Sequence, residues 1–128
     1  MASKRIFLVD DDDRIREIVA DILTRAGYEV HGTGDPKTAV ALATEKQPDL
    51  AILDIMMPDV DGFQVAFGLR DNPKTAKIPF LFLTARSAAH DAGAARDVGA
   101  AAYLEKPFKK DSLLAIVAEL LSSTAAHS

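Results

Sequence analysis

The segment Ile6–Asp11 reads IFLVDD, four apolar residues that run directly into two carboxylates. Three later segments have the same form, an apolar run that ends in polar residues: Leu50–Asp54, Phe80–Thr84 and Ala101–Lys106. The continuous apolar runs Ile6–Val9, Leu50–Leu53 and Phe80–Leu83 are typical of β-strands that are buried on both faces of a parallel sheet. In such a sheet the polar ends of the four runs would meet at one edge, which is where open α/β sheets bind ligands.

Segments with the helical spacing of apolar residues separate these runs. The first precedes Gly27, a residue type that commonly follows the last turn of a helix. The second opens at Asp35-Pro36, which places aspartate at the N-cap and proline at the first helical position. We expect this second helix to end before Pro48.

Later segments complete the alternation. Phe63–Leu69 predicts a third helix, and Leu113–Leu121 predicts the last one, with Asp111 as its N-cap. Ser87–Val98 predicts a helix with few large apolar residues to anchor it, which fits either a moving part or a plain solvent-exposed helix. Tyr28–His31 alternates apolar with polar residues and predicts an edge strand. Five βα units predict an α/β fold, a doubly wound five-stranded parallel sheet with five helices.

Composition favours one soluble domain. The chain has 128 residues, enough for one hydrophobic core, and we expect the domain to span residues 1–122 and residues 123–128 to be a disordered tail. It has no cysteine, which favours a reducing, cytoplasmic compartment. We expect no signal peptide and no membrane span, because no apolar stretch approaches the roughly 18–20 residues that a bilayer requires. The net charge of -4, without a basic stripe, argues against direct nucleic-acid binding.

The acidic run Asp10–Asp13 suggests a metal site. Helix capping accounts for Asp12 or Asp13, because aspartate is favoured at an N-cap and in a first helical turn. It does not explain carboxylates at the end of the strand itself, where they should approach Asp54. Like charges held close together destabilise a fold unless a cation neutralises them. Mg²⁺, which prefers oxygen ligands, would do so.

Asp54 has the chemistry of a phosphoryl acceptor. A carboxylate can attack a phosphoryl group and carry it as an acyl phosphate. Lys106 would neutralise phosphoryl oxygens, and Thr84 would donate its hydroxyl to one of them. Taken singly, Lys106 is also explained as a solvated surface charge and Thr84 as a β-branched residue at a strand end. The combination carries the inference.

These residues match a known family. The chain resembles the receiver domain of bacterial two-component response regulators over essentially its whole length, and we see no departure at the principal active-site positions. The matching segments are Phe7–Asp12, Leu53–Gly62, Leu83–Ala85 and Gly99–Phe108. The resemblance implies a flavodoxin-like fold with strand order 2-1-3-4-5, which agrees with an edge position for the second strand.

The resemblance also implies the reaction. Asp54 would be the phosphoacceptor and would receive its phosphoryl group from a histidine kinase or a histidine phosphotransfer protein. Asp10 and Asp11 would hold Mg²⁺ together with Asp54 and the backbone carbonyl of Met56. Lys106 would pair with the phosphoryl group. The protein would then be a phosphorylation-controlled signalling switch and not an enzyme, apart from catalysing its own phosphorylation and dephosphorylation.

A conformational switch follows from the same resemblance. Thr84 would turn toward the phosphoryl group, and Tyr103 would move inward with it as the switch aromatic. Without the family, Tyr103 is also explained as a half-buried strand aromatic. We expect the target protein to bind the face formed by residues 87–121. The base rate for X-Pro bonds predicts a trans Lys106-Pro107 bond, whereas the family favours cis.

Three other functions remain open on the sequence. A haloacid-dehalogenase-like phosphohydrolase would need an acid two residues after its nucleophile, where this chain has Met56. A flavodoxin would need a Ser/Thr/Gly phosphate loop after the first strand, where this chain has aspartates. A receiver-like module that works without phosphorylation is the third, and the complete set of site residues argues against it.

Two variable positions bear on the lifetime of the phosphorylated state. Met56 and Arg86 lie two residues after Asp54 and Thr84 and would flank the path of an attacking water. Because Met56 offers that water no hydrogen bond, we expect slow autodephosphorylation, which Met56→Asn should accelerate. We expect no output domain after the last helix, so the chain would be a single-domain regulator or a receiver taken from a longer protein.

Overall fold

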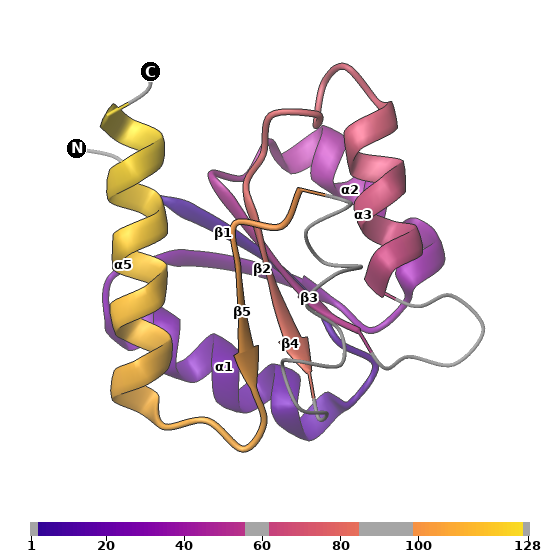
Figure 1. Cartoon of the computed structure of the whole chain (residues 1–128). Coiled ribbons are helices and arrows are strands. Elements are labelled where there is room, and N and C mark those ends of the chain that lie inside the picture. Colours follow the sequence, from indigo (N-terminus) through magenta and orange to yellow (C-terminus); the bar gives the residue numbers. More distant parts are fainter. Residues whose placement is uncertain (1–2, 56–61, 85–98, 127–128) are drawn as a thin grey trace.

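The computed structural model describes residues 3–55, 62–84 and 99–126, with side chains as far as residue 122. Its five strands form one parallel sheet in the order β2-β1-β3-β4-β5 (Figure 1). The strands are β1 Arg5–Val9, β2 Glu29–Thr33, β3 Leu50–Asp54, β4 Phe80–Thr84 and β5 Ala102–Glu105. The predicted α/β fold and its strand order are therefore confirmed, including the position of the second strand at an edge.

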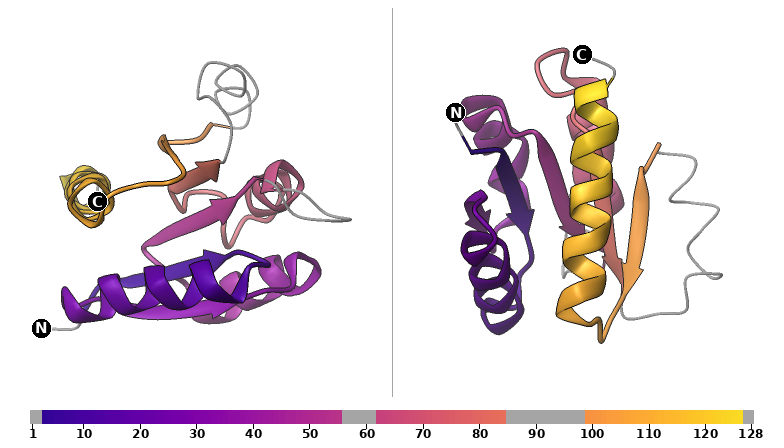
Figure 2. Two further views of the ribbon diagram at one scale, coloured as in Figure 1. Left: turned by 90° about the horizontal axis from the view of Figure 1, so that it is seen from below. Right: turned by 90° about the vertical axis from the view of Figure 1, so that its left-hand side faces the viewer.

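The helices cover both faces of this sheet. They are α1 Asp13–Arg25, the 3₁₀ turn η1 Pro36–Thr38, α2 Ala39–Lys46, α3 Gly62–Asp71 and α5 Lys110–Ala126. Helices α1 and α5 pack on one face, and α2 and α3 pack on the other (Figure 2). The helix that we predicted over Ser87–Val98 lies outside the described residues. No helix in the described ranges has the length and apolarity that crossing a bilayer requires.

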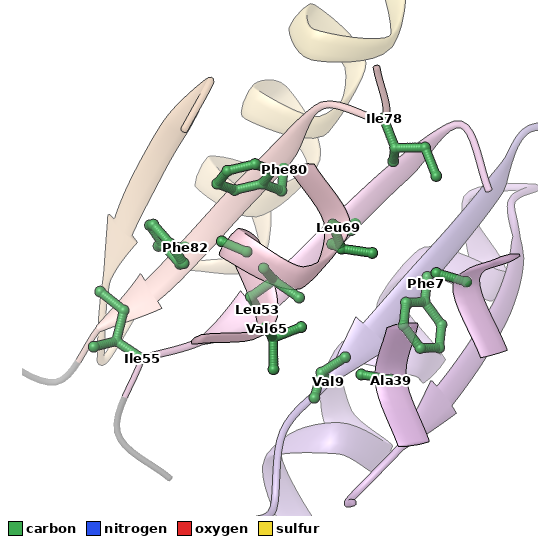
Figure 3. Packing of buried hydrophobic residues seen from close by; sticks show 13 residues of the cluster. Phe7, Val9, Ala39, Leu53, Ile55, Val65, Leu69, Ile78, Phe80 and Phe82 are labelled. Carbon is green, nitrogen blue, oxygen red and sulfur yellow. The ribbon is translucent and has the colours of Figure 1, made fainter. Parts of the chain in front are cut away.

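Strand alternation divides the core into two layers. In β1, Phe7 and Val9 point toward α2 and α3, whereas Ile6 and Leu8 point toward α1 and α5. Phe80 and Phe82 of β4 pack edge to face in the first layer, with ring centroids 5.4 Å apart (Figure 3). All five residues of β3 and of β4 are buried, which explains why their sequences are continuous apolar runs.

Local signals set most helix ends where the sequence predicts them. The Asp12 carboxylate accepts hydrogen bonds from the backbone N–H groups of Arg14 and Ile15 and caps α1. Asp35 caps η1 in the same way, through the N–H of Lys37 at 3.0 Å. Gly27, with φ of 101°, follows α1 in a conformation that favours glycine.

Two expectations are wrong. Helix α5 begins at Lys110, so Asp111 lies in its first turn, where the helix dipole also favours an acid, and is not the N-cap. The backbone of α5 is helical as far as Ala126, and the boundaries that we expected, a domain over residues 1–122 and a tail over residues 123–128, stay predictions. The Lys106-Pro107 bond is cis, against the base rate and in agreement with the resemblance.

Candidate functional site

The carboxyl ends of four strands bring the predicted site residues to one edge of the sheet. Asp10 follows β1, Asp54 ends β3, Thr84 ends β4 and Lys106 follows β5. The strand register places Asp54 beside Leu83 and Thr84 beside Glu105, so the ends lie level with one another. These side chains are far apart in the sequence, since Asp10 and Lys106 are separated by 96 positions.

Three carboxylates gather at this edge. Asp10 is fully buried, Asp54 is 2% exposed, and Asp11 is exposed to solvent. One carboxylate oxygen from each of the three lies within 4.8 Å of the other two. The Asp10 Oδ1 atom also accepts a hydrogen bond of 2.9 Å from the backbone N–H of Asp12, which ties the buried carboxylate to the turn that follows it.

Lys106 lies between the two buried carboxylates. Its Nζ is 3.4 Å from Asp10 Oδ2 and 3.3 Å from Asp54 Oδ1, and its side chain is largely buried. The pKa of Asp54 is raised to about 6. Burial is the main cause, the negative charge of Asp10 acts in the same direction, and the Lys106 ammonium opposes both effects. One ammonium therefore faces two buried carboxylates, and Asp11 adds a third negative charge beside them.

The donor set fits a hard divalent cation. Three carboxylates with oxygens this close offer the ligands that Mg²⁺ prefers, and one side of the group, at Asp11, opens to solvent for waters or a phosphate. The sequence-based prediction that Asp10 and Asp11 approach Asp54 is confirmed by this geometry. The carbonyl of Met56, which the resemblance adds as a ligand, lies outside the described residues.

Thr84 and Tyr103 occupy the β4–β5 side of the site. Thr84 is fully buried, and its carbonyl accepts a hydrogen bond of 2.6 Å from the backbone N–H of Lys106. Tyr103 is 39% exposed and stands on the face of β5 opposite to Ala102 and Leu104, which pack toward α5. Arg86 and the 87–98 part of the predicted target-binding face lie outside the described residues.

The structure shows two contributors that the sequence analysis passed over. At Gly62, a Cβ would meet the backbone carbonyl oxygen of Asp54. The N–H of Gly62 donates to the carbonyl of Ile55 at 3.1 Å, so α3 starts directly against the end of β3. Arg16 donates to the backbone carbonyl of Asp10 at 2.8 Å. No sequence signal marks this contact, because arginine on a first helical turn is ordinarily solvated.

Comparison with known proteins shows the family of this chain. The model of the family described as response regulator receiver domain matches residues 6–118. The DNA-binding dual master transcriptional regulator RpaA of Synechocystis sp. is 45% identical over 120 residues, which cover 94% of this chain and 50% of that protein. The transcriptional regulatory protein GltR of Pseudomonas aeruginosa is 39% identical and is covered to 49%. The chain thus spans about half the length of these curated relatives.

Solved structures show the same architecture. The chemotaxis protein CheY4 of Vibrio cholerae has a TM-score of 0.88 at 32% identity, with 93% of this chain and 99% of that chain covered. The receiver domain of a sensor histidine kinase from Pseudomonas aeruginosa has a TM-score of 0.86 at 27% identity, with 94% and 99% covered. That structure holds a magnesium ion coordinated in its active site cleft.

Proposed function

The chain belongs to the response regulator receiver domain family of two-component signalling, whose members are phosphorylated on an aspartate, and we propose that Asp54 is that aspartate in this protein. One observation carries the proposal. Asp54 is the buried carboxylate at the end of the central strand β3, and it lies 3.3 Å from Lys106 and within 4.8 Å of oxygens of Asp10 and Asp11.

The reaction is a phosphoryl transfer to the Asp54 carboxylate. A carboxylate oxygen attacks the phosphorus of a phosphohistidine, the new O–P bond forms as the P–N bond breaks, and the histidine nitrogen leaves with its electron pair and takes up a proton. The product is an acyl phosphate on Asp54. With a pKa of about 6, the Asp54 carboxyl is mainly ionised at neutral pH and is ready to attack.

Phosphoryl transfer requires positive charge beside the phosphoryl oxygens. Lys106 already pairs with Asp54 and would follow the phosphoryl oxygens once they are attached. Asp10, Asp11, Asp54 and the Met56 carbonyl would hold Mg²⁺, which when bound supplies further positive charge next to the phosphoryl oxygens. The donor histidine would belong to a histidine kinase or a histidine phosphotransfer protein.

Phosphorylation would act on the partner surface through Thr84 and Tyr103. A dianionic group on Asp54 attracts the Thr84 hydroxyl, and any movement of Thr84 reaches β5 through its hydrogen bond to Lys106. Tyr103 lies on the same strand and is 39% exposed before phosphorylation. Its inward movement would change the 87–121 face, where a target protein binds. We place this switch in the cytoplasm, and its catalysis is limited to its own aspartyl phosphate.

Intact mass spectrometry after incubation with acetyl phosphate tests the proposal. The parent should gain one phosphoryl group when Mg²⁺ is present and none in EDTA, and Asp54→Ala should gain none. Asp21→Ala, an exposed aspartate of α1 outside the site, should react like the parent. An adduct that persists in Asp54→Ala would assign another acceptor. If the parent forms no adduct and no beryllofluoride complex, a module that works without phosphorylation is correct instead.

A further inference from the structure

Arg16 lies one turn into α1 and reaches back toward the acidic segment Asp10–Asp13. Its Nη1 donates to the backbone carbonyl of Asp10 at 2.8 Å, and its Nη2 pairs with Asp13 Oδ1 at 2.6 Å. The Arg16 side chain is 26% exposed, whereas that of Asp13 is 82% exposed. The guanidinium therefore joins the end of β1 to the first turn of α1 from a position that is mostly shielded from water.

Two glycines provide the space for this side chain. A Cβ on Gly34 would lie 2.6 Å from Arg16 Nη1 and 3.6 Å from the carbonyl oxygen of Asp10. A Cβ on Gly32 would lie 3.3 Å from Arg16 Cδ. The guanidinium thus also packs against the backbone that follows β2, and a side chain at residue 34 would occupy part of the space that the guanidinium fills.

The carbonyl that Arg16 binds belongs to the peptide unit joining Asp10 to Asp11. Because a peptide unit is planar, holding its oxygen fixes the direction in which the Asp11 backbone leaves β1. The next peptide unit, which joins Asp11 to Asp12, is held as well, since the N–H of Asp12 donates to the Asp10 carboxylate at 2.9 Å. Asp11, the exposed carboxylate of the cluster, is therefore oriented by contacts that its neighbours make.

We propose that Arg16 is a positioning residue for the magnesium site, which orients Asp11 toward Asp10 and Asp54 by holding the Asp10–Asp11 peptide unit. This role rests on the proposed function of these three aspartates as metal ligands. Arg16 acts through the backbone, because its hydrogen bonds go to the Asp10 carbonyl and to Asp13. Removal of residues that orient metal ligands weakens metal binding by about 10- to 100-fold.

An amide NMR titration with MgCl₂ measures this effect without relying on phosphorylation. Arg16→Gln should weaken Mg²⁺ binding by about 10-fold relative to the parent. Arg14→Gln removes the same charge from the same turn of α1, at an exposed position, and should bind Mg²⁺ like the parent. Urea unfolding of each variant in EDTA records its stability separately, so that weaker binding by a folded protein is recognised as such.

Two further variants separate geometry from charge. Arg16→Lys keeps the charge but loses the forked donor that reaches both partners, so it should bind Mg²⁺ as weakly as Arg16→Gln. Gly34→Ala keeps every charge and displaces the guanidinium, and it should weaken binding in the same direction. These two variants carry the test if Arg16→Gln does not fold.

Each alternative result has a clear meaning. Equal Mg²⁺ affinity of the parent, Arg16→Lys and Gly34→Ala would overturn the role of Arg16 and leave the proposed function standing. Equal weakening in Arg14→Gln and Arg16→Gln would also overturn it, because charge and not position would then be responsible. A parent protein that binds no Mg²⁺ would overturn the magnesium site itself.

Discussion

At the carboxyl edge of the sheet, Asp10 and Asp54 combine burial with a charge that burial disfavours. Asp10 and Asp54 are buried because the strands that carry them are buried, yet both are acids that water would otherwise solvate. Lys106 at 3.4 and 3.3 Å offsets part of that cost, and the raised pKa of Asp54 shows that part of it remains. The proposed site for Mg²⁺ and the phosphoryl group would thus be obtained at the expense of stability in the metal-free protein.

We predict that Asp54→Asn stabilises the metal-free protein at neutral pH. The folded-state pKa of Asp54 is raised from 3.8 to about 6, so the folded protein binds more protons than the unfolded chain between these values. The stabilisation that the folded protein gains from the protonated Asp54 carboxyl is therefore fully present below pH 3.8, and it is lost as the pH rises through about 6. The shift sets an upper limit of about 3 kcal/mol, and we expect a gain of about 1–2 kcal/mol at pH ~7.5.

Urea unfolding in EDTA near pH 7.5 and near pH 4 measures this gain, which should shrink at the lower pH. Asp21→Asn is the matched control, because Asp21 is exposed and pairs with Arg25 across one helical turn. Its removal should change the free energy of unfolding by less than about 0.5 kcal/mol. The electrostatic account of the site is wrong if Asp54→Asn is no more stable than the parent near pH 7.5.

At the scale of elements, α3 is tied to both neighbouring segments at its C-terminal end. Arg70 in its last turn donates through Nη1 to the carbonyls of Ala76 and Ile78, and through Nη2 to the carbonyl of Gly99 at 3.0 Å. Its guanidinium also lies 4.4 Å above the centre of the Phe80 ring. One side chain thus connects α3, the turn before β4 and the residues leading into β5. These contacts lie near the amino ends of β4 and β5, whereas Asp54 lies at the carboxyl end of β3.

Loss of this connection should be costly. We predict that Arg70→Ala lowers the free energy of unfolding by about 2–3 kcal/mol, because three carbonyls lose a charged donor and Phe80 loses its cation contact. Arg25→Ala on α1 removes an exposed pair with Asp21 and should cost less than about 0.5 kcal/mol. Thermal or urea unfolding of both variants provides the measurement, and similar losses would show that the Arg70 contacts contribute no more than a surface ion pair.

The whole molecule is a sheet with a protected centre and two edges. β1, β3 and β4 each have strands on both sides, whereas β2 and β5 are bounded on one side only within the described residues. Side chains of β3 and β4 are buried throughout, and those of β5 alternate between partly buried and exposed. Stability is therefore concentrated in the strand that carries Asp54, while the strand that carries Tyr103 lies at the periphery.

Hydrogen exchange should reveal this gradient. We predict that amides of β3 exchange by global unfolding, whereas amides of β5 exchange through smaller openings and are about 10-fold or more faster. This arrangement would suit a switch, because β5 can change without disturbing β3, the strand of the proposed phosphoacceptor. Native-state exchange followed by NMR measures the difference, and equal protection of β3 and β5 would contradict it.

Much of this structure could be predicted from the order of residues. Apolar runs that end in Asp10, Asp54 and Thr84 indicate buried parallel strands, because burial on both faces leaves no polar position inside a strand. Asp12 and Asp35 mark helix starts for an equally local reason, since their carboxylates cap the N–H groups that follow. Local chemistry was a poorer guide to the start of α5, where Asp111 lies in the first turn and is not the N-cap.

Contacts between distant segments depend on how the sheet and helices pack. The two distances from Lys106 to Asp10 and Asp54, the raised pKa of Asp54, and the approach of Gly62 to the Asp54 carbonyl follow from strand register and twist. The contacts of Arg16 and Arg70 are of the same kind, because a long side chain on a helix has many partners within reach. Residue order therefore specifies which groups reach the edge of the sheet. Packing in three dimensions sets their distances, and with them the electrostatics of the site.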